Sequence, residues 1–195
     1  MVKVSQDVFN LDEDVIFGIV YMPPKNIRYS SSAAFAEYLV FSSNYNYISL
    51  LADFNGRTSN DDDFILINKT RHGDNFADFI NDDLVTLDEL RIPKNKNNLD
   101  KVKNGYENKL LEFCKGNSLF LLNGRVWEDR HEGRLTCKNL STVDYCLCSL
   151  KLLKCVNNFR ILSSAAYTPM STLHYISHFT KRNLLKMQII SQTKM

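Results

Sequence analysis

Two short apolar runs, each stopped by turn-forming residues, constrain the fold more than any other feature of this chain. Residues Val15–Met22 (VIFGIVYM) end at Pro23-Pro24, and residues Tyr47–Phe54 (YISLLADF) end at Asn55-Gly56. Both runs have the length of a strand and are rich in β-branched and large apolar side chains, which is typical of buried strands. The chain therefore predicts a sheet that contains these two segments.

The other expected elements follow from the same kind of pattern. A helix is predicted at Ser32–Phe41, after serines able to cap it, and a second at Tyr106–Lys115, which Gly116-Asn117 stops. The Asp- and Asn-rich segment Thr58–Lys103 predicts a loop-rich insertion with one short element near Phe76–Leu87. Further strands are predicted at Leu119–Leu122, Val143–Ser149, Val156–Ile161 and His174–Phe179, and the basic tail 181–195 is predicted to be a frayed helix. With 195 residues, this mixture indicates a single α/β (α+β) domain.

The spacing of the cysteines and the net charge indicate which compartment and which partners to expect. The five cysteines lack paired Cys-x-x-Cys spacing, and Cys146 and Cys148 alternate with Tyr145 and Leu147 along one predicted strand. This pattern predicts buried thiols in a reducing compartment, with zinc ligation as the minor alternative. We see no secretory signal and no run of about 20 apolar residues, so we expect a soluble intracellular protein, nuclear or cytoplasmic, with no membrane partner. A formal charge of +2 means that any binding of nucleic acid would use a local basic patch.

The sharpest local signal for chemistry is the pair Asp53 and Asn55 at the end of an apolar strand. Residues two apart on a strand point to the same side, so a carboxylate and a carboxamide would project together from a rigid element. Such a pair could hold a hard cation and a phosphoryl oxygen. The structural alternative is that both residues simply form the turn that closes the strand.

Five segments follow one another along the chain: Val20–Pro24, Ala52–Thr58, Asp100 to Arg125 (with Asn104-Gly105, Leu110–Lys115 and Leu121–Arg125), Val143–Tyr145 with Ser149, and Ser171–Ser177. In this order they resemble a Tyr-x-Pro turn, a Gly-Asp-x-Asn strand end, a later helix and strand, an Asp-Tyr strand, and a closing Ser-Asp-His motif. These motifs belong to the second half of the endonuclease/exonuclease/phosphatase fold, and the resemblance is strongest to the endonuclease domains of non-LTR retrotransposons. The resemblance covers a core of residues 15–180. It implies a partial four-layer αββα sandwich of deoxyribonuclease I-like type, which lacks its N-terminal strands.

The resemblance also implies catalytic roles for four residues and a Mg²⁺ (or Mn²⁺) cofactor. Asp53 would orient or deprotonate the attacking water beside the metal, and Asn55 would hold that water or a phosphoryl oxygen. His174 would stabilise the charge that builds on the scissile phosphate, and Asp144 would hydrogen-bond the other imidazole nitrogen of His174. A lone His at a strand start is more often structural, whereas a buried Asp144 on an apolar strand needs a partner.

Phosphate contacts are implied for Tyr29, Arg57, Asn123 and Arg125. For both arginines the structural alternative is a solvated surface side chain. The acidic run Asp61–Asp63 resembles a metal cluster, but we expect it to be a solvated loop.

Two departures from the family pattern bear on activity. The family's N-terminal portion, with its metal-binding Glu, has no counterpart in residues 1–14, and Leu173 stands where an Asp precedes the final His. We therefore expect a truncated, impaired Mg²⁺-dependent endonuclease of retrotransposon origin, acting on DNA rather than RNA, whose missing N-terminal half could lie on another chain. The alternative is a catalytically inactive remnant, or a module for nucleic-acid or protein interaction on the same fold. Hydrolysis of phosphomonoesters or lipid phosphates is a third alternative, which the Arg57-Thr58 and Asn-Gly-Arg segments disfavour.

Overall fold

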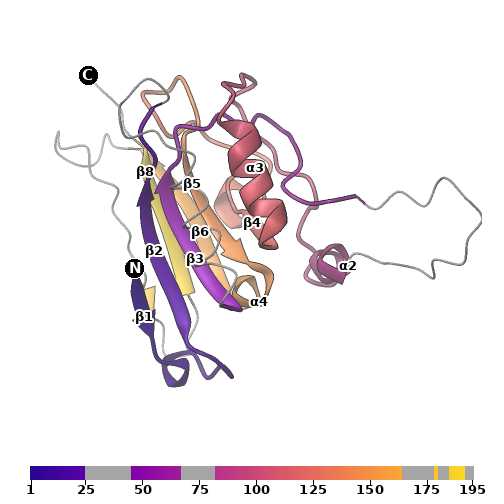
Figure 1. Ribbon diagram of the computed structural model, residues 1–195, viewed down its shortest axis with the longest axis vertical. Coiled ribbons are helices and arrows are strands. Elements are labelled where there is room, and N and C mark those ends of the chain that lie inside the picture. The colour runs from indigo at the N-terminus through magenta and orange to yellow at the C-terminus, as the bar shows by residue number, and fades with distance from the viewer. Residues whose placement is uncertain (25–44, 67–81, 164–177, 180–184, 192–195) are drawn as a thin grey trace, which may run out of the picture.

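A five-stranded mixed sheet is built around the two apolar runs. The computed structural model describes residues 1–24, 45–66, 82–163, 178–179 and 185–191 (Figure 1). The predicted strands at the two runs are confirmed as β2 (Val15–Tyr21) and β3 (Tyr47–Asp53), which pair in parallel. The antiparallel neighbours are β1 (Val2–Val4) beside β2, β5 (Asp144–Ser149) beside β3, and β4 (Leu119–Leu121) beside β5, so the order is β1-β2-β3-β5-β4.

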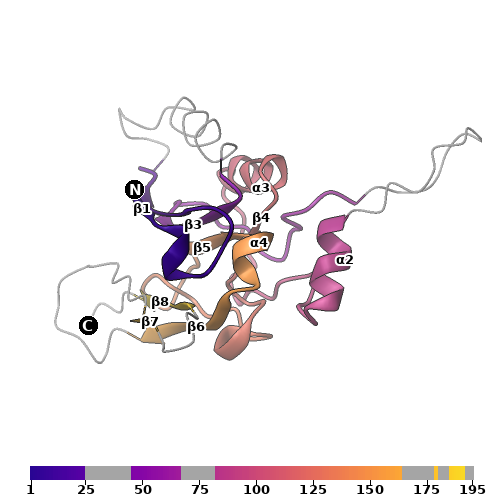
Figure 2. The same ribbon diagram turned by 90° about the horizontal axis from the view of Figure 1, so that it is seen from below.

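Each face of this sheet has its own apolar core. The predicted helix is confirmed as α3 (Glu107–Gly116), whose residues Leu110 and Phe113 pack with Leu50 and Leu147 on one face. On the other face Leu51 and Cys146 share a core with residues of the strand β6 (Val156–Ser163). The expected alternation along β5 is confirmed, because Tyr145 and Leu147 lie in the first core whereas Cys146 and Cys148 lie in the second. The layers are therefore helix, sheet and second sheet (Figures 1 and 2).

The second sheet contains an unexpected strand. It has the order β6-β8-β7, in which β8 (Leu185–Ser191) pairs in parallel with β6 and antiparallel with β7 (His178–Phe179). The frayed helix predicted for the basic tail is therefore wrong at residues 185–191. The scattered basic residues of the tail suggested a helix. Within it, however, Leu185, Met187 and Ile189 alternate with Lys186 and Gln188, which is the two-residue period of a strand.

Connections differ from the predictions in smaller ways. Of the short element predicted near 76–87, the part that the structure describes belongs to a helix, α2 (Asp82–Glu89). The predicted helix 32–41 lies outside the described residues. Only the end of the strand predicted at 174–179 falls on described residues, as β7. The turns that the pattern missed are too short to show periodicity: η1 (Gln6–Val8), η2 (Trp127–Asp129) and α4 (Leu150–Leu153). Within the described ranges, no helix combines the length and apolar character needed to cross a bilayer.

Candidate functional site

Two carboxylates face each other at one end of the central sheet. Asp53 is the last residue of β3 and Asp144 is the first of β5, and the two are directly opposite in the antiparallel pairing. Directly opposite residues project their side chains from the same face of a sheet, within contact range. This is the face of Leu51 and Cys146, which the second sheet covers. The resemblance therefore named two residues, 91 positions apart in sequence, that the fold brings together.

The surroundings of this pair disfavour negative charge. Burial, and then the charge of Asp53, raise the pKa of Asp144 to about 7, although a hydrogen bond with the Thr136 side chain lowers it. Burial also raises the pKa of Asp53, against a lowering contribution from the Asn55 backbone N–H. Neither carboxylate forms an ion pair with the part of the chain that the structure describes. The result is an acidic pair without a compensating cation among those residues.

Asn55 both closes β3 and stands next to the pair. Its backbone N–H donates to Oδ1 of Asp53 at 3.0 Å, and its φ of +49° lies in the left-handed region that Asn tolerates. Its Nδ2 donates to the carbonyl of Met22 at 2.7 Å, which ties β3 to the end of β2. The structural alternative for Asn55 is thus confirmed, and its proposed contact with water or phosphate stays a prediction.

Tyr21 is a site residue that sequence reasoning missed. It is the register partner of Asp53 across the parallel β2–β3 pair, so Tyr21, Asp53 and Asp144 form a row over three neighbouring strands. Its side chain is 61% exposed although it ends a buried strand. The sequence contained a signal for this placement, because Tyr21 continues the two-residue period that puts Val15 and Phe17 on the same face of β2.

Two predicted site residues cannot be placed. His174 and Tyr29 lie outside the described residues. The contact between His174 and Asp144, and the phosphate contact of Tyr29, therefore stay predictions.

Arg125 has a structural role that the prediction of a phosphate contact did not foresee. Its side chain is fully buried, and its Nη1 and Nη2 donate to the two carboxylate oxygens of Asp63 at 2.8 and 2.6 Å. The same guanidinium donates to the carbonyls of Leu121 and Lys94 and lies over the ring of Phe120. The alternative of a solvated surface side chain is therefore wrong for Arg125, and its phosphate contact stays a prediction.

Asp63 is buried, so the interpretation of the acidic run 61–63 as a solvated loop is wrong at this residue. Burial raises the pKa of Asp63, but the charge and hydrogen bonds of Arg125 outweigh this and hold the pKa below its ordinary value. Its Oδ2 also accepts the backbone N–H of Leu121 at 2.7 Å. Asp63 thus joins the loop that follows β3 to strand β4 at Leu121, 58 residues later in the chain, which no local pattern could indicate.

Asn123 is likewise used inside the fold. Its Nδ2 donates to the carbonyl of Asp144, and its Oδ1 accepts the backbone N–H of Cys146, both at 3.1 Å. The side chain is buried and extends the ladder between β4 and β5. Asn123 therefore holds the backbone of Asp144, and its phosphate contact stays a prediction.

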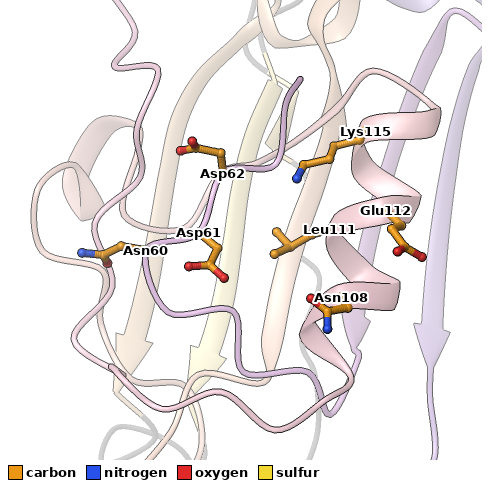
Figure 3. A pocket seen from close by; sticks show the side chains of 7 residues that line it. All are labelled: Asn60, Asp61, Asp62, Asn108, Leu111, Glu112 and Lys115. Atoms are coloured by element: carbon orange, nitrogen blue, oxygen red, sulfur yellow. The ribbon is translucent and has the colours of Figure 1, made fainter. Parts of the chain in front are cut away.

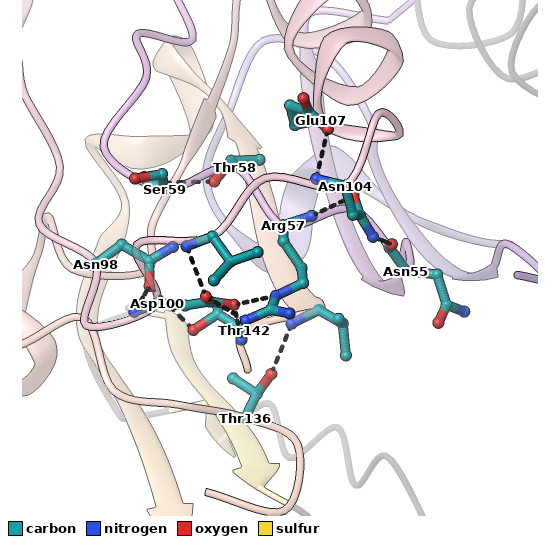
Figure 4. A network of polar contacts seen from close by, with 12 residues as sticks. Asn55, Arg57, Thr58, Ser59, Asn98, Asp100, Asn104, Glu107, Thr136 and Thr142 are labelled. Carbon is teal, nitrogen blue, oxygen red and sulfur yellow. Dashed lines mark hydrogen bonds and ion pairs between the residues drawn. The ribbon is translucent and has the colours of Figure 1, made fainter. Parts of the chain in front are cut away.

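Arg57 belongs to a polar network with Asp100 and Thr142 (Figure 4). Its Nε and Nη2 donate to the carboxylate of Asp100 at 2.8 and 2.6 Å, and Asp100 also accepts the backbone N–H of Thr142 at 2.9 Å. The Arg57 side chain remains 26% exposed. Its predicted phosphate contact is thus restricted to the exposed part of the guanidinium and stays a prediction.

A hollow separate from the carboxylate pair lies on the helix-covered side of the sheet (Figure 3). It measures about 450 Å³ and is lined by residues 60–62 and by the α3 residues Asn108, Leu111, Glu112 and Lys115. Asp61 is already paired with Lys103 at 2.6 Å. We assign no chemistry to this hollow, because nothing in it is both buried and without a partner.

The Mg²⁺ or Mn²⁺ cofactor stays a prediction. Within the described ranges, no group of three or more His, Cys, Asp or Glu side chains is arranged to hold a metal ion. Asp53 and Asp144 supply two carboxylates on one face, which fits a divalent cation in charge and donor type but not in ligand number. Comparisons of the chain with protein-family models, with curated protein sequences and with solved structures find no match.

Proposed function

We propose that the chain carries a metal-dependent phosphodiesterase site, centred on Asp53 and Asp144, that hydrolyses phosphodiester bonds in nucleic acid. The single observation that carries the proposal is the cross-strand carboxylate pair, which has no cationic partner among the described residues. Like charges held together in a partly buried place are costly, and such arrangements concentrate at functional sites. A divalent cation would remove that cost.

The donor set favours a hard cation such as Mg²⁺ or Mn²⁺. Asp53 would hold it, because this carboxylate is the more accessible of the two, whereas Asp144 is only 3% exposed. Water, a phosphate oxygen or further carboxylates would complete the near-octahedral shell. When bound, such a cation supplies charge stabilisation at the phosphoryl oxygens.

The protein's own groups would orient the water and hold the charge. Asp53 would orient or deprotonate the attacking water, and Asn55 would contact that water or a phosphoryl oxygen. Asp144 would fix the imidazole of His174, which would stabilise the charge that builds on the phosphate. Tyr21, exposed in the same row as both carboxylates, would line the side of the site toward β2.

The layering supports a deoxyribonuclease I-like sandwich as the finer description of the fold. In a four-layer αββα arrangement, α3 would be one outer layer, and the sheets that contain β3 and β6 would be the two inner ones. The candidate pair lies at the end of β3 on the face between those sheets. Proposed ancestry in a retrotransposon endonuclease, with DNA favoured over RNA, rests on the segments that resemble that family.

A nicking assay on supercoiled plasmid tests the proposal. We expect cleavage with Mg²⁺ or Mn²⁺, loss of cleavage with a chelator, and loss of at least about 100-fold in Asp53→Asn and Asp144→Asn, since one transition-state group contributes about 3 kcal/mol. Asp62→Asn is the matched control, because Asp62 lines the hollow of Figure 3 and not the pair. The proposal fails if a pure, folded protein does not cleave, or if Asp62→Asn loses as much activity as Asp53→Asn.

A non-catalytic role is the second candidate, and one observation favours it. Two of the four residues expected to contact phosphate, Asn123 and Arg125, are buried and bonded within the fold. A chain with few free phosphate contacts could bind nucleic acid or protein without cleaving it. Retained DNA binding in a gel-shift assay, with no nicking in any metal, would support this candidate.

A further inference from the structure

The carboxylate of Asp100 joins the two segments that flank the candidate pair (Figure 4). Its side chain is buried. Arg57, four residues after Asp53, donates Nε and Nη2 to this carboxylate at 2.8 and 2.6 Å. Thr142, two residues before Asp144, donates its backbone N–H to it at 2.9 Å. One buried group therefore holds both the loop that leaves β3 and the loop that enters β5.

Neutral hydrogen bonds support the same connection. The hydroxyl of Tyr145 donates to the carbonyl of Thr142 at 2.8 Å and accepts the backbone N–H of Thr58 at 3.2 Å. Oδ1 of Asn98 accepts both the Thr142 hydroxyl at 3.0 Å and the backbone N–H of Asp100 at 2.9 Å. Hydrogen bonds to an ionised group are about twice as strong as neutral ones, so the carboxylate of Asp100 makes the strongest of these connections.

The carboxylate pair itself weakens this end of the β3–β5 ladder. Phe54 donates its backbone N–H to the carbonyl of Val143 at 2.9 Å, as in a hydrogen-bonded pair of an antiparallel ladder. The next pair inward, Asp53 and Asp144, is therefore a non-hydrogen-bonded pair, whose side chains lie closer together. Like charges directly opposite destabilise a sheet, so two ionised carboxylates here would drive the strand ends apart.

We propose that Asp100 is a positioning residue of the candidate site, which closes this end of the β3–β5 pair and keeps the side chains of Asp53 and Asp144 together. Arg57 and Thr142 share one buried carboxylate, so neither loop can move away without breaking a charge-assisted hydrogen bond. Groups that are held in place before a substrate binds lose little entropy when it does. The inference rests on the proposed function for its meaning in catalysis, but the closure of the strand end can be measured without substrate.

Asp63 provides a matched control. It is also a buried carboxylate that accepts two guanidinium nitrogens, at 2.8 and 2.6 Å, and one backbone N–H, at 2.7 Å. Its partners are Arg125 and Leu121, which belong to β4 and the turn after it rather than to the segments that flank the carboxylate pair. Asp63→Ala therefore removes a buried, arginine-paired carboxylate and leaves the connection through Asp100 in place.

The test measures the strand end by NMR in the full-length chain. We expect a strong nuclear Overhauser effect between the Hα protons of Asp53 and Asp144 in the wild type, because the Cα atoms of a non-hydrogen-bonded pair approach closely. Leu51 and Cys146 form the next such pair inward and give the reference signal. Asp100→Ala should lose the first signal and keep the second, because the strand ends separate while the rest of the ladder stays paired.

A second measurement needs no variant and decides the question if Asp100→Ala does not fold. In the wild type, the hydrogen bond from the Thr142 backbone N–H should give a scalar coupling between that nitrogen and the carboxyl carbon of Asp100. Absence of this coupling in the folded wild type would overturn the inference. So would an unchanged Asp53–Asp144 signal in folded Asp100→Ala, or an equal loss of that signal in folded Asp63→Ala.

Plasmid nicking by Asp100→Ala and the wild type separates this inference from the proposed function. If both hold, Asp100→Ala loses about 10-fold to 100-fold in kcat, the range for groups that hold a site residue in place. Nicking that is absent from both proteins, with the expected NMR signals, contradicts the proposed function alone. A change in KM for DNA with kcat equal to that of the wild type contradicts the positioning role.

Discussion

At the scale of single residues, the folded chain maintains an unfavourable pair of charges. Asp144 is almost fully buried, and its pKa of about 7 means that ionisation at neutral pH opposes folding. Burial also raises the pKa of the neighbouring Asp53. The buried carboxylates Asp63 and Asp100 are each paired with an arginine, and the buried Asp129 accepts two backbone N–H groups. The Asp53–Asp144 pair differs from these groups because a second carboxylate lies directly opposite the first.

Asp144→Asn should stabilise the protein at neutral and higher pH. The folded protein keeps a proton on Asp144 that the unfolded chain releases, so the stability from this group is present below pH about 4. It is lost as the pH rises from there to about 7. At pH 8 we expect the variant to be more stable by about 2 kcal/mol, with little difference at pH 4. Urea unfolding across this pH range measures both values, and an equal difference at pH 4 and pH 8 would contradict the account.

Arg125→Met should have the opposite effect. Removal of the guanidinium leaves the Asp63 carboxylate buried and unpaired, which costs about 3–5 kcal/mol of unfolding free energy. The double variant Arg125→Met with Asp63→Leu should recover most of that loss, because both charges of the buried pair are removed together. Urea unfolding of the three proteins is the measurement. A double variant as unstable as the single one would show that the arginine acts through its other contacts.

At the scale of elements, the packing of the turn after β4 against the loop before α3 depends on a close approach of backbone at Gly124. This glycine has a φ of +68°, and a Cβ there would lie 1.7 Å from the carbonyl oxygen of Asn97. Asn97 in turn donates its backbone N–H to the Gly124 carbonyl at 3.1 Å. The turn after β4 and the loop before α3 can therefore pack only when residue 124 has no side chain.

Gly124→Ala should destabilise the protein far more than Gly105→Ala. Gly105 has a similar φ of +77° but open space around its Cβ position, so it isolates the cost of backbone conformation, which is about 1 kcal/mol. We expect Gly124→Ala to cost about 3 kcal/mol more than this control. Thermal unfolding of both variants measures the difference, and similar melting temperatures would contradict the close packing.

Sequence periodicity predicted the elements whose burial is regular. The strands β2, β3 and β5 and the helix α3 each show the spacing that their cores require, and the alternation along β5 places Asp144 on the correct face. Periodicity could not predict the partner of Asp63 or the bonds of Asn123, because such pairings join residues distant in sequence. It also failed for β8, where scattered lysines suggested a helix although the alternation of a strand was present.

At the scale of the whole molecule, the candidate pair lies beside an uncovered part of the sheet. Ile19 and Tyr21 of β2 are 63% and 61% exposed on the face that holds Asp53 and Asp144, whereas Leu51 on the next strand is buried. The boundary between the covered and the exposed parts of this face therefore passes along the pair. If the proposed function holds, a large substrate would approach Asp53 from this exposed side of the sheet.

Binding of Mn²⁺ tests most directly whether this pair is a cation site. Mn²⁺ is a paramagnetic substitute for Mg²⁺ and broadens the NMR signals of nuclei close to it. We expect the backbone signals of Tyr21, Asp53 and Asp144 to broaden first in the wild type, and to stay sharp in Asp53→Asn at the same Mn²⁺ concentration. Broadening that begins at Asp61, Asp62 and Glu112, or that persists unchanged in Asp53→Asn, would contradict the central claim.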